Sequence, residues 1–584
     1  MSDRDRDLPV IVAAEAAEAL LASADRSGVR TIWFTSGSEL APLQEAAAKA
    51  AALRRPAPRI VTVPHEHVGL CLAMGETLVT GGPSCAAAHA DLGLLNFGGA
   101  IHNAALGGYP VLMISGYPPT TPAERTAPVF WKQQRRDPAG IVRQYVKWDF
   151  RPAVYDDLSV VTARAVQVAL SPPRGPVYLA LPAEVVGHPV GGEVTVLGAG
   201  DLGVPVLGAG PPDAVTDIAR RLLAAEAPLV LTDRVGRDPR AVALLAELAE
   251  RFALAVRATR HRMNLPDGHP ASAGATPAGT ALTGADAVLV LEHPVPWIPA
   301  AERPDPAAFV AVVGEDPAAT GIPLYEFAAD LRVTADAAAF LAALGERMDA
   351  LRTDAQRHRH ADRWASMLTR RSELDAARAG LLRRDRAAGI PTPAAVAAAV
   401  GEVVEPEDVF TWELADTDGV TRTRAGTLFD KGGSSLGWAV AAATGARYSD
   451  RARPAVCLTG DGSYMFGVSP VLLWMQQHLD APVLTVICNN RGYRTGTQTV
   501  AERYPDGYAV ASGDFSGGFF DPPPDFAAEA RAAGGFGARV HDLGELAGTL
   551  AGARRAVEVD RRPAVVDVWL PAHVTGAHPL AGRS

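Results

Sequence analysis

The sequence predicts an α/β protein built from three doubly wound parallel-sheet domains. Short apolar stretches alternate with amphipathic, alanine-rich helical stretches in three separate parts of the chain, which is the pattern of parallel sheets covered by helices. The length of 584 residues is also too great for one hydrophobic core, since a domain commonly holds about 100–200 residues. We therefore expect domains at 1–193, 213–345 and 386–575.

Each segment contains apolar stretches whose length and composition predict strands. In the first segment these are 31–35, 59–63, 110–116 and 176–182. In the second they are 228–233, 286–292 and 307–316, and in the third 408–413, 454–462, 482–490 and 563–571. Residues 194–212, rich in Gly, Pro and Val, predict a linker. Residues 346–385, rich in Arg, Asp and Ala at helical spacing, predict an exposed connecting helix.

Charge and cysteine content argue against several classes of protein. A formal net charge of −10 and a pI near 5.8 disfavour broad binding to nucleic acid or anionic membranes. The four cysteines show no metal-ligand spacing, which fits buried thiols in a reducing compartment. The charged N-terminus lacks the apolar core of a signal peptide, and no apolar run reaches the ~18 residues of a membrane helix. We expect a cytoplasmic protein.

The most informative motif is Gly460-Asp461-Gly462-Ser463, which closes an apolar stretch. Asn489-Asn490 closes the next predicted strand, and 26 residues separate Gly462 from Asn489. Because the carboxyl ends of parallel strands meet at one edge of a sheet, Asp461 and Asn490 should converge. Carboxylate, amide and carbonyl oxygens suit Mg²⁺. We therefore expect Asp461, Asn490 and the backbone of Gly492 to bind this ion.

Glycine-rich turns around this motif predict contacts with phosphate groups. Glycine lacks a Cβ and lets the backbone approach a ligand closely. A second loop, Lys431-Gly432-Gly433-Ser434-Ser435, opens a helix predicted at 436–445, and amides at a helix N-terminus favour anions. The predicted diphosphate contacts are Gly433, Ser434, Ser435, Gly460, Gly462 and Ser463.

A glutamate in the first segment is the candidate for acid–base chemistry. Glu66 directly follows the predicted strand 59–63 and precedes an apolar helix. This position leaves two interpretations open. The carboxylate is either held in a partly buried place for chemistry, or it favours the positive end of the helix dipole.

These motifs resemble those of the thiamine diphosphate-dependent enzyme superfamily, which includes acetolactate synthase and benzoylformate decarboxylase. GDGS followed by NNRGY is similar to its metal and diphosphate signature, and the stretch around Glu66 is similar to its pyrimidine-binding region. The resemblance implies a pyrimidine-binding first domain, a central domain, and a third domain that binds diphosphate and Mg²⁺. It implies that Glu66 activates the cofactor and that Leu436 lies beneath its bent rings. It also implies that the active site lies between two subunits of an obligate homodimer. A tetramer made of two such dimers is the alternative assembly.

Two further residues match benzoylformate decarboxylase. These are Ser38, in a tight turn, and His89, which comes 23 residues after Glu66. The resemblance implies that both line the substrate site and assist proton transfer, which histidine performs near neutral pH. A structural histidine is the alternative interpretation of His89. Three other histidines are candidates for the same role: His65, His67 and His102. A second catalytic histidine from the middle domain is not matched, because a proline stands at its position and His293 is out of register.

Residues 131–134, 141–150 and 172–185 resemble acetolactate synthase. Within them, Gln133 matches a glutamine that faces the cofactor in that family. Two departures limit this likeness. Residues 88–93 replace the glycine-rich loop expected after the glutamate, and residues 232–236 replace the glycine cluster expected at an FAD site. Thiamine diphosphate and Mg²⁺ are therefore the expected cofactors, and FAD binding is doubtful.

We expect a lyase or transferase that cleaves or forms a carbon–carbon bond next to a carbonyl, acting as a 2-oxo acid decarboxylase or carboligase. Substrate choice should depend on Ser38, His89, Gln133 and residues 491–503. Within that last segment Tyr493 is expected near the cofactor. One alternative is a 2-hydroxyacyl-CoA lyase, which would need a basic groove. Another is a non-catalytic paralogue, which would ordinarily have lost the glutamate or a metal ligand.

Overall fold

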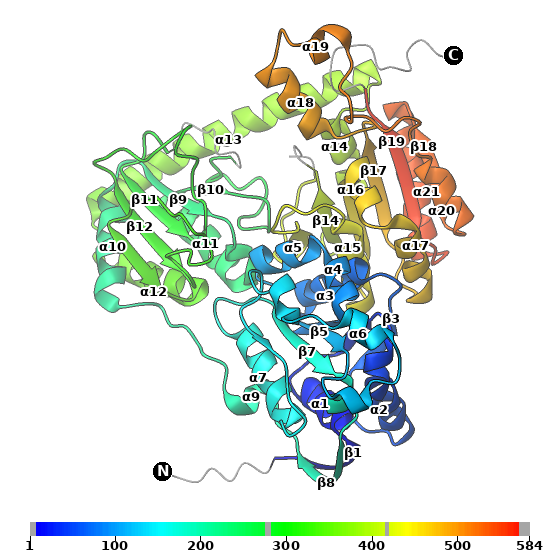
Figure 1. The fold of residues 1–584 in the computed structure, drawn as a ribbon. Helices are drawn as coiled ribbons and strands as arrows, with labels where there is room; N and C mark the ends of the chain where they lie inside the picture. Colours follow the sequence, from blue (N-terminus) through cyan, green and yellow to red (C-terminus); the bar gives the residue numbers. More distant parts are fainter. Residues whose placement is uncertain (1–7, 275–281, 415–419, 572–584) are drawn as a thin grey trace.

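Three parallel β-sheets with flanking helices make up the chain, which confirms the predicted α/β fold (Figure 1). The computed structural model describes residues 8–274, 282–414 and 420–571. The predicted features at 1–7 and 572–575 lie outside these ranges. The three sheets fall within the three expected domain ranges, and the domain boundaries themselves remain predictions.

The first sheet has six parallel strands in the order β3-β2-β4-β5-β7-β6. The strands are β2 Thr31–Phe34, β3 Arg59–Thr62, β4 Ser84–Ala88, β5 Val111–Tyr117, β6 Asp149–Phe150 and β7 Val177–Pro182. The helices are α1 Ala16–Arg26, α2 Ala41–Ala52, α3 Glu66–Thr80, α4 Ala90–Phe97, α5 Ala100–Gly107, α6 Val129–Gln133, α7 Leu158–Leu170 and α8 Ala183–Val186. The central strands β4, β5 and β7 are buried throughout, as expected for a sheet covered on both faces.

The middle sheet has five parallel strands in the order β10-β9-β11-β12-β13. The strands are β9 Pro228–Thr232, β10 Ala255–Ala258, β11 Ala287–Leu291, β12 Phe309–Gly314 and β13 Leu331–Thr334. Its helices include α10 Pro212–Ala224, α11 Pro239–Phe252 and α12 Ala337–Leu351. The strand order reverses between β9 and β11, so the carboxyl ends of these two strands border the crevice typical of such sheets.

The third sheet has six parallel strands in the order β15-β14-β16-β17-β19-β18. The strands are β14 Val409–Glu413, β15 Leu428–Phe429, β16 Ala455–Gly460, β17 Leu484–Asn489, β18 Phe536–Val540 and β19 Ala564–Trp569. The helices are α14 Pro393–Val403, α15 Ala439–Ser449, α16 Asp461–Phe466, α17 Ser469–His478, α18 Arg494–Arg503, α19 Tyr508–Ser512, α20 Phe526–Ala532 and α21 Leu543–Glu558. Strands β16 and β17 are hydrogen-bonded neighbours, which places their carboxyl ends side by side.

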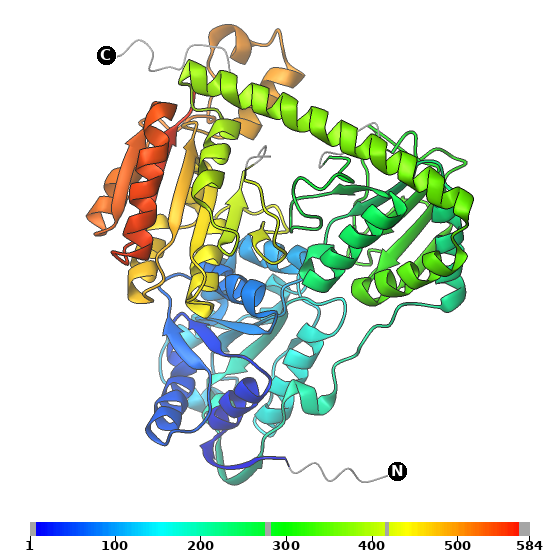
Figure 2. The same cartoon turned by 180° about the vertical axis from the view of Figure 1, so that it is seen from behind.

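The connecting segments differ from the sequence prediction in three places. Strand β8 (Pro189–Thr195) extends into the expected linker and pairs antiparallel with β1 (Val10–Glu15), and a short helix α9 (Ala199–Leu202) follows. The expected helix at 346–385 is interrupted after α12, and α13 (Asp354–Ala388) begins anew. The reason for the new start is Thr353, whose Oγ1 accepts a hydrogen bond from the Gln356 amide at the first turn of α13. Both views show α13 running from the middle sheet to the third (Figures 1 and 2).

The first and third sheets share one apolar core through helices α3 and α15. A single buried cluster contains Leu72 and Met74 of α3 together with Ala442 and Ala443 of α15. Glycines on both helices allow the backbones to approach closely. The packing of α3 on α15 therefore fixes the carboxyl edges of the two sheets relative to each other within one chain. Among the described residues, no helix has both the length and the apolar character needed to span a bilayer.

Candidate active site

The GDG and NN turns meet at the carboxyl edge of the third sheet. Asp461 begins α16 directly after β16, and its Oδ1 accepts a hydrogen bond from the Gly462 amide at 2.9 Å. Its Oδ2 accepts one from the Gly492 amide, which follows β17, at 3.0 Å. The side chain is 1% exposed. Burial raises the pKa of Asp461 to about 6, although the amides that donate to it act in the opposite direction.

Asn490 places a second side-chain oxygen, after that of Asp461, at this sheet edge. Its Oδ1 is buried and has no hydrogen-bond partner in the part of the chain that the structure describes. An orphaned buried oxygen beside a buried carboxylate fits a hard cation, because the cation would satisfy both groups. The residues present at this edge are therefore compatible with Mg²⁺.

The first asparagine of the pair has a different task, which the sequence did not reveal. Asn489 donates from Nδ2 to Oδ1 of Asp567 at 2.8 Å, and its own Oδ1 accepts from the Arg491 amide at 3.0 Å. Arg491 adopts a left-handed backbone with φ of 62°. Asn489 thus holds the turn that carries Asn490 and Gly492. The sequence signal would have been a second acid, Asp567, on the neighbouring strand β19.

The glycine loop (residues 431–435) is fastened to helix α5 of the first sheet. Asn103 donates from Nδ2 to the Ser435 carbonyl at 2.9 Å and accepts from the Ser435 amide at 3.0 Å. A Cβ at Gly433 would lie 2.5 Å from Asn103 Oδ1, so only glycine permits this approach. Ser434 is exposed, which leaves its side chain accessible.

The predicted start of the following helix is wrong by three residues, because α15 begins at Ala439 and leaves Leu436 in the loop. The reason is Glu413, at the end of β14. Its carboxylate accepts hydrogen bonds from the amides of Gly437, Trp438 and Ala439 at 2.9–3.0 Å. Burial raises the pKa of Glu413 to about 7, and Lys431 Nζ lies 3.5 Å away. No motif in the sequence marks Glu413 as part of the site.

Glu66 forms the first residue of α3, at the carboxyl edge of the first sheet. Its side chain is buried, and its Oε2 accepts a hydrogen bond from Asn96 Nδ2 at 3.1 Å. A Cβ at Gly93 would lie 2.7 Å from Oε1, so α4 passes directly over the carboxylate. The next residue, His67, has its Nε2 3.4 Å from the Gly437 carbonyl oxygen. The structure therefore brings the start of α3 to the loop that contains Leu436, within one chain.

His89 and Gln133 lie together, whereas Ser38 does not join them. Gln133 Nε2 is 2.9 Å from His89 Nε2, and Gln133 Oε1 is buried with no hydrogen-bond partner among the described residues. Ser38 is exposed. Its neighbour Glu39 is fully buried and places Oε2 2.9 Å from His89 Nδ1. The sequence pattern pointed to the serine of this turn and not to the glutamate.

The segment after Asn490 lies over the GDG turn. The Tyr493 ring is within 3.1 Å of the position of a Cβ on Gly462, and its amide donates to the Gly518 carbonyl at 2.8 Å. The ring also meets Phe520 edge-on at a centroid distance of 5.0 Å. Tyr493 is 40% exposed, so one face of the ring remains available beside the turn.

The middle sheet presents charged residues to the glycine loop. Arg234 and Arg237 donate to the carbonyls of Leu106 and Gly107 at the end of α5, at 2.8 and 3.0 Å. His261 Nδ1 lies 2.6 Å from Asp233 Oδ1 at the end of β9. His293 follows β11, and burial lowers its pKa to about 4. Arg234 and Arg237 therefore join the middle domain to helix α5 of the first domain.

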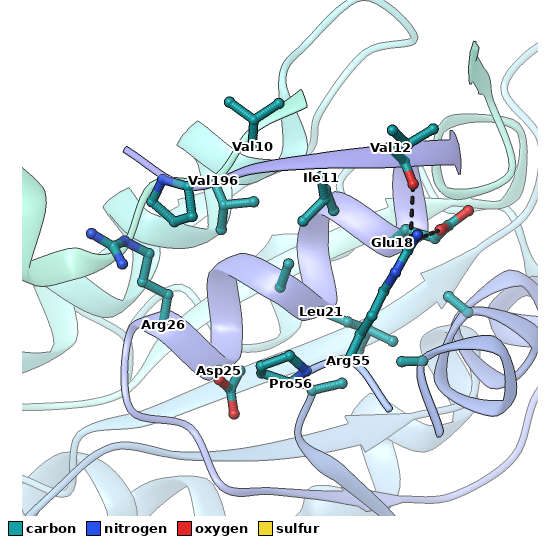
Figure 3. Close-up of a pocket in the computed structure, with 15 residues that line it drawn as sticks. Val10, Ile11, Val12, Glu18, Leu21, Asp25, Arg26, Arg55, Pro56 and Val196 are labelled. Atoms are coloured by element: carbon teal, nitrogen blue, oxygen red, sulfur yellow. Dashed lines mark hydrogen bonds and ion pairs between the residues drawn. The ribbon is translucent and has the colours of Figure 1, made fainter. Parts of the chain in front are cut away.

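A hollow of about 680 Å³ lies elsewhere, beneath strand β1 (Figure 3). Its walls include Ile11 of β1 and Leu21 of α1, and each charged residue that lines it forms an ion pair. Glu18 contacts Lys49 at 2.7 Å and Arg55 at 3.7 Å. None of the predicted site residues lines it. The predicted site residues therefore lie at the facing sheet edges and not at this hollow.

Comparison with known proteins identifies the class. Residues 14–135 match the family model described as "Thiamine pyrophosphate enzyme, N-terminal TPP binding domain". Residues 416–568 match "Thiamine pyrophosphate enzyme, C-terminal TPP binding domain". The chain belongs to the thiamine diphosphate-dependent enzyme superfamily, as its motifs predict.

Individual relatives include two kinds of decarboxylase. Benzoylformate decarboxylase of Pseudomonas aeruginosa is 26% identical over 445 residues, which cover 74% of this chain and 78% of that protein. Oxalyl-CoA decarboxylase of Escherichia coli K12 is 28% identical over 245 residues, or 41% of this chain and 42% of that protein. The chain is thus a thiamine diphosphate-dependent enzyme related to benzoylformate decarboxylase.

Solved structures show the same fold over nearly the whole chain. Benzoylformate decarboxylase from Polynucleobacter necessarius has a TM-score of 0.76 at 20% identity, covering 97% of this chain and 100% of that one. The 4-hydroxybenzoylformate decarboxylase of Rhodococcus jostii has a TM-score of 0.74 at 21% identity, covering 95% and 99%.

Proposed function

We propose that this chain is a Mg²⁺- and thiamine diphosphate-dependent 2-oxo acid decarboxylase or carboligase. The observation that carries the proposal is the junction of Asp461 and Gly492, with the orphaned oxygen of Asn490 beside it. A buried carboxylate and an unsatisfied amide oxygen suit a cation shared between protein and diphosphate. We assign Mg²⁺ to Asp461, Asn490 and Gly492.

The remaining contacts follow from the loops at the same edge. We assign the diphosphate to the backbone and hydroxyl groups of the two glycine-rich turns, and the rings to the space beside Leu436 and Tyr493. The turn residues are Gly433, Ser434, Ser435, Gly460, Gly462 and Ser463. When bound, thiamine diphosphate supplies a carbon nucleophile and an electron sink for bond cleavage next to a carbonyl.

The protein's own contribution would come from the first domain. Glu66, fixed by Asn96 and covered by α4, is the carboxylate that would hydrogen-bond the pyrimidine. His89, whose side chain is 28% exposed, would hold or move a proton at the substrate. Gln133 lies against His89 and would orient the same group. We place substrate selection at these residues, at the exposed Ser38 and at residues 491–503.

We further propose a homodimer as the active unit, in which Glu66 serves the cofactor of the partner subunit. The superfamily resemblance supports this arrangement, whereas the contact of His67 with Gly437 within one chain would suit an intrachain site. Mixing a Glu66→Gln variant with an Asp461→Ala variant provides the test. Dissociation and reassembly should restore activity, because a mixed dimer contains one site with both native residues. A strictly intrachain site would give no recovery.

A CoA thioester substrate is the second candidate. The match to oxalyl-CoA decarboxylase over 245 residues favours it. A non-catalytic paralogue would ordinarily have lost the activating glutamate or a metal ligand. This chain keeps Glu66, Asp461 and Asn490, which disfavours that alternative.

The deciding experiment measures cofactor dependence. Protein stripped of metal and thiamine diphosphate is offered a panel of 2-oxo acids, including pyruvate and benzoylformate, and CO₂ release and products are followed. We expect turnover that requires both cofactors. Cofactor binding without turnover of any 2-oxo acid would favour the hypothesis of a CoA thioester substrate. Turnover of oxalyl-CoA would then test that hypothesis. Failure to bind thiamine diphosphate would overturn the proposal.

A further inference from the structure

The first domain contains a buried carboxylate that contacts the imidazole of His89. Glu39 lies on the short 3₁₀ turn Ser38–Leu40, and its side chain has no exposed surface. Its Oε2 is 2.9 Å from His89 Nδ1. The other ring nitrogen, Nε2, is 2.9 Å from Gln133 Nε2. Glu39, His89 and Gln133 therefore form a continuous chain of contacts, in which His89 is the partly exposed member.

Two glycines make room for this chain. A Cβ on Gly37 would lie 2.4 Å from His89 Nδ1 and 3.0 Å from Glu39 Oε2. A Cβ on Gly116, in β5, would lie 2.7 Å from the Glu39 Cβ. Any larger residue at either position would displace the carboxylate or the ring. The backbone is thus shaped around the contact between Glu39 and His89.

The chain also lies close to the proposed activator. His89 directly precedes α4, and its carbonyl accepts a hydrogen bond from the Gly93 amide at 2.7 Å. Gly93 in turn lies against Oε1 of Glu66. One turn of helix therefore separates the imidazole from the carboxylate expected at the pyrimidine.

We propose that Glu39 is a positioning residue that holds His89 in the tautomer protonated at Nδ1, so that Nε2 exchanges protons with the substrate. A carboxylate only accepts hydrogen bonds, so the contact at Nδ1 requires a proton on that nitrogen. Nε2 is then the basic nitrogen of the neutral ring. This proposal rests on the proposed function, because it assumes that His89 moves a proton.

Gln133 suits both protonation states of Nε2. Its Nε2 donates to the unprotonated ring nitrogen in the structure. Its buried Oε1, which lacks a partner among the described residues, would accept from a protonated Nε2 after rotation of the amide. The glutamine can therefore bond Nε2 in either state, and it must give way when the substrate reaches that nitrogen.

The kinetic test compares wild-type protein with Glu39→Gln, Glu39→Asp and His89→Ala, each loaded with Mg²⁺ and thiamine diphosphate. We expect Glu39→Gln to lower kcat about 10- to 100-fold with KM within about threefold, as for other residues that orient a reacting group. Glu39→Asp should recover part of this loss. In the His89→Ala background, Glu39→Gln should change kcat less than twofold. Glu45→Gln on α2, an exposed carboxylate, is the matched control and should leave kcat unchanged.

An unchanged kcat in Glu39→Gln, or equal losses with and without His89, would overturn the proposal. A second measurement does not depend on turnover. In NMR spectra of protein labelled with ¹⁵N-histidine, the signals of His89 are assigned by their loss in His89→Ala. The His89 ring should be protonated at Nδ1 in wild type and should be a mixture of the two tautomers in Glu39→Gln. A ring protonated at Nε2 in wild type would contradict the role of Glu39. If the ring behaves as expected and no 2-oxo acid turns over, the proposed function fails and the tautomer assignment stands.

Discussion

Gly75 of α3 faces Ala442 of α15 so closely that a Cβ on the glycine would lie 2.1 Å from the Ala442 carbonyl oxygen. The relationship is reciprocal, because a Cβ on Gly445 would lie 2.1 Å from the Leu72 carbonyl oxygen. Both obstacles are backbone atoms, which cannot turn aside as a flexible side chain can. The contact between the first and third sheets therefore depends on two glycines.

Replacing Gly75 with alanine should force the two helices apart. Because overpacking of a filled interior commonly costs about 1–3 kcal/mol, we expect Gly75→Ala to lower the free energy of unfolding by about that amount. Urea denaturation measures it. Gly548→Ala, in the interior of α21 with no atom within 4 Å of the new Cβ, should not destabilise the protein. Equal stability of both variants would show that α3 and α15 do not pack this closely.

Replacing Glu66 with glutamine should remove the proposed activating carboxylate and preserve its shape. We expect kcat to fall at least about 100-fold, which is within the range of general acid–base contributions, while the Kd for thiamine diphosphate changes little. Steady-state kinetics and calorimetry measure the two quantities. Glu76→Gln is the matched control on the same helix, since Glu76 is buried but bonds Trp33 and Ser84 instead. Normal turnover in Glu66→Gln would remove the assignment.

Asn490 and Asn489 should respond differently to alanine. Asn490 Oδ1 has no partner among the described residues, so Asn490→Ala should leave the stability of metal-free protein unchanged and raise the Mg²⁺ requirement at least about tenfold. Asn489→Ala loses the bonds to Asp567 and Arg491, so metal-free protein should be less stable by about 1–3 kcal/mol. Thermal unfolding with and without Mg²⁺ separates the two effects. A loss of stability in metal-free Asn490→Ala would show that the side chain bonds within the protein, and would argue against its role as a Mg²⁺ ligand.

Glu292 should make the protein less stable as pH rises. Burial and the nearby Glu315 carboxylate raise its pKa to about 7, whereas the ordinary value is 4.5. Between these pH values the folded chain retains a proton that the unfolded chain has lost, so the free energy of unfolding falls as pH rises. Glu292→Gln cannot lose this proton and still offers an oxygen to the Glu315 amide, which donates at 2.8 Å.

We therefore expect Glu292→Gln to match wild type near pH 4.5 and to exceed its stability by about 1–3 kcal/mol at pH 8. Urea denaturation at several pH values measures the difference. A constant difference across the pH range would show that the titration of Glu292 does not govern it.

Sequence patterns predicted the sheets well and single side-chain partners poorly. The long apolar stretches at β5, β7, β16 and β17 carry a clear signal. Strand β4, with the sequence SCAAA, does not, because alanine and serine are not typical strand residues. The convergence of Asp461 with the NN turn followed from the rule that parallel strands end at one edge.

The missed residues depend on contacts across distant parts of the chain. Glu39 is separated from His89 by 50 residues, and Glu413 caps a helix start more than 20 residues further along. No local spacing links these pairs. The sequence pattern pointed instead to Ser38, which is exposed, because a serine in a tight turn is easier to notice than a buried acid one position later.

The bond between Asn103 and the glycine loop has a consequence for the lifetime of the protein in cells. The segment expected to hold the diphosphate is the same one that fastens the first sheet to the third. A ligand that binds there stabilises the closed arrangement by mass action. Shortage of the vitamin from which thiamine diphosphate is made should thus increase opening between the sheets and expose the chain to proteases. Abundance of the protein would then follow the supply of thiamine diphosphate as well as gene expression.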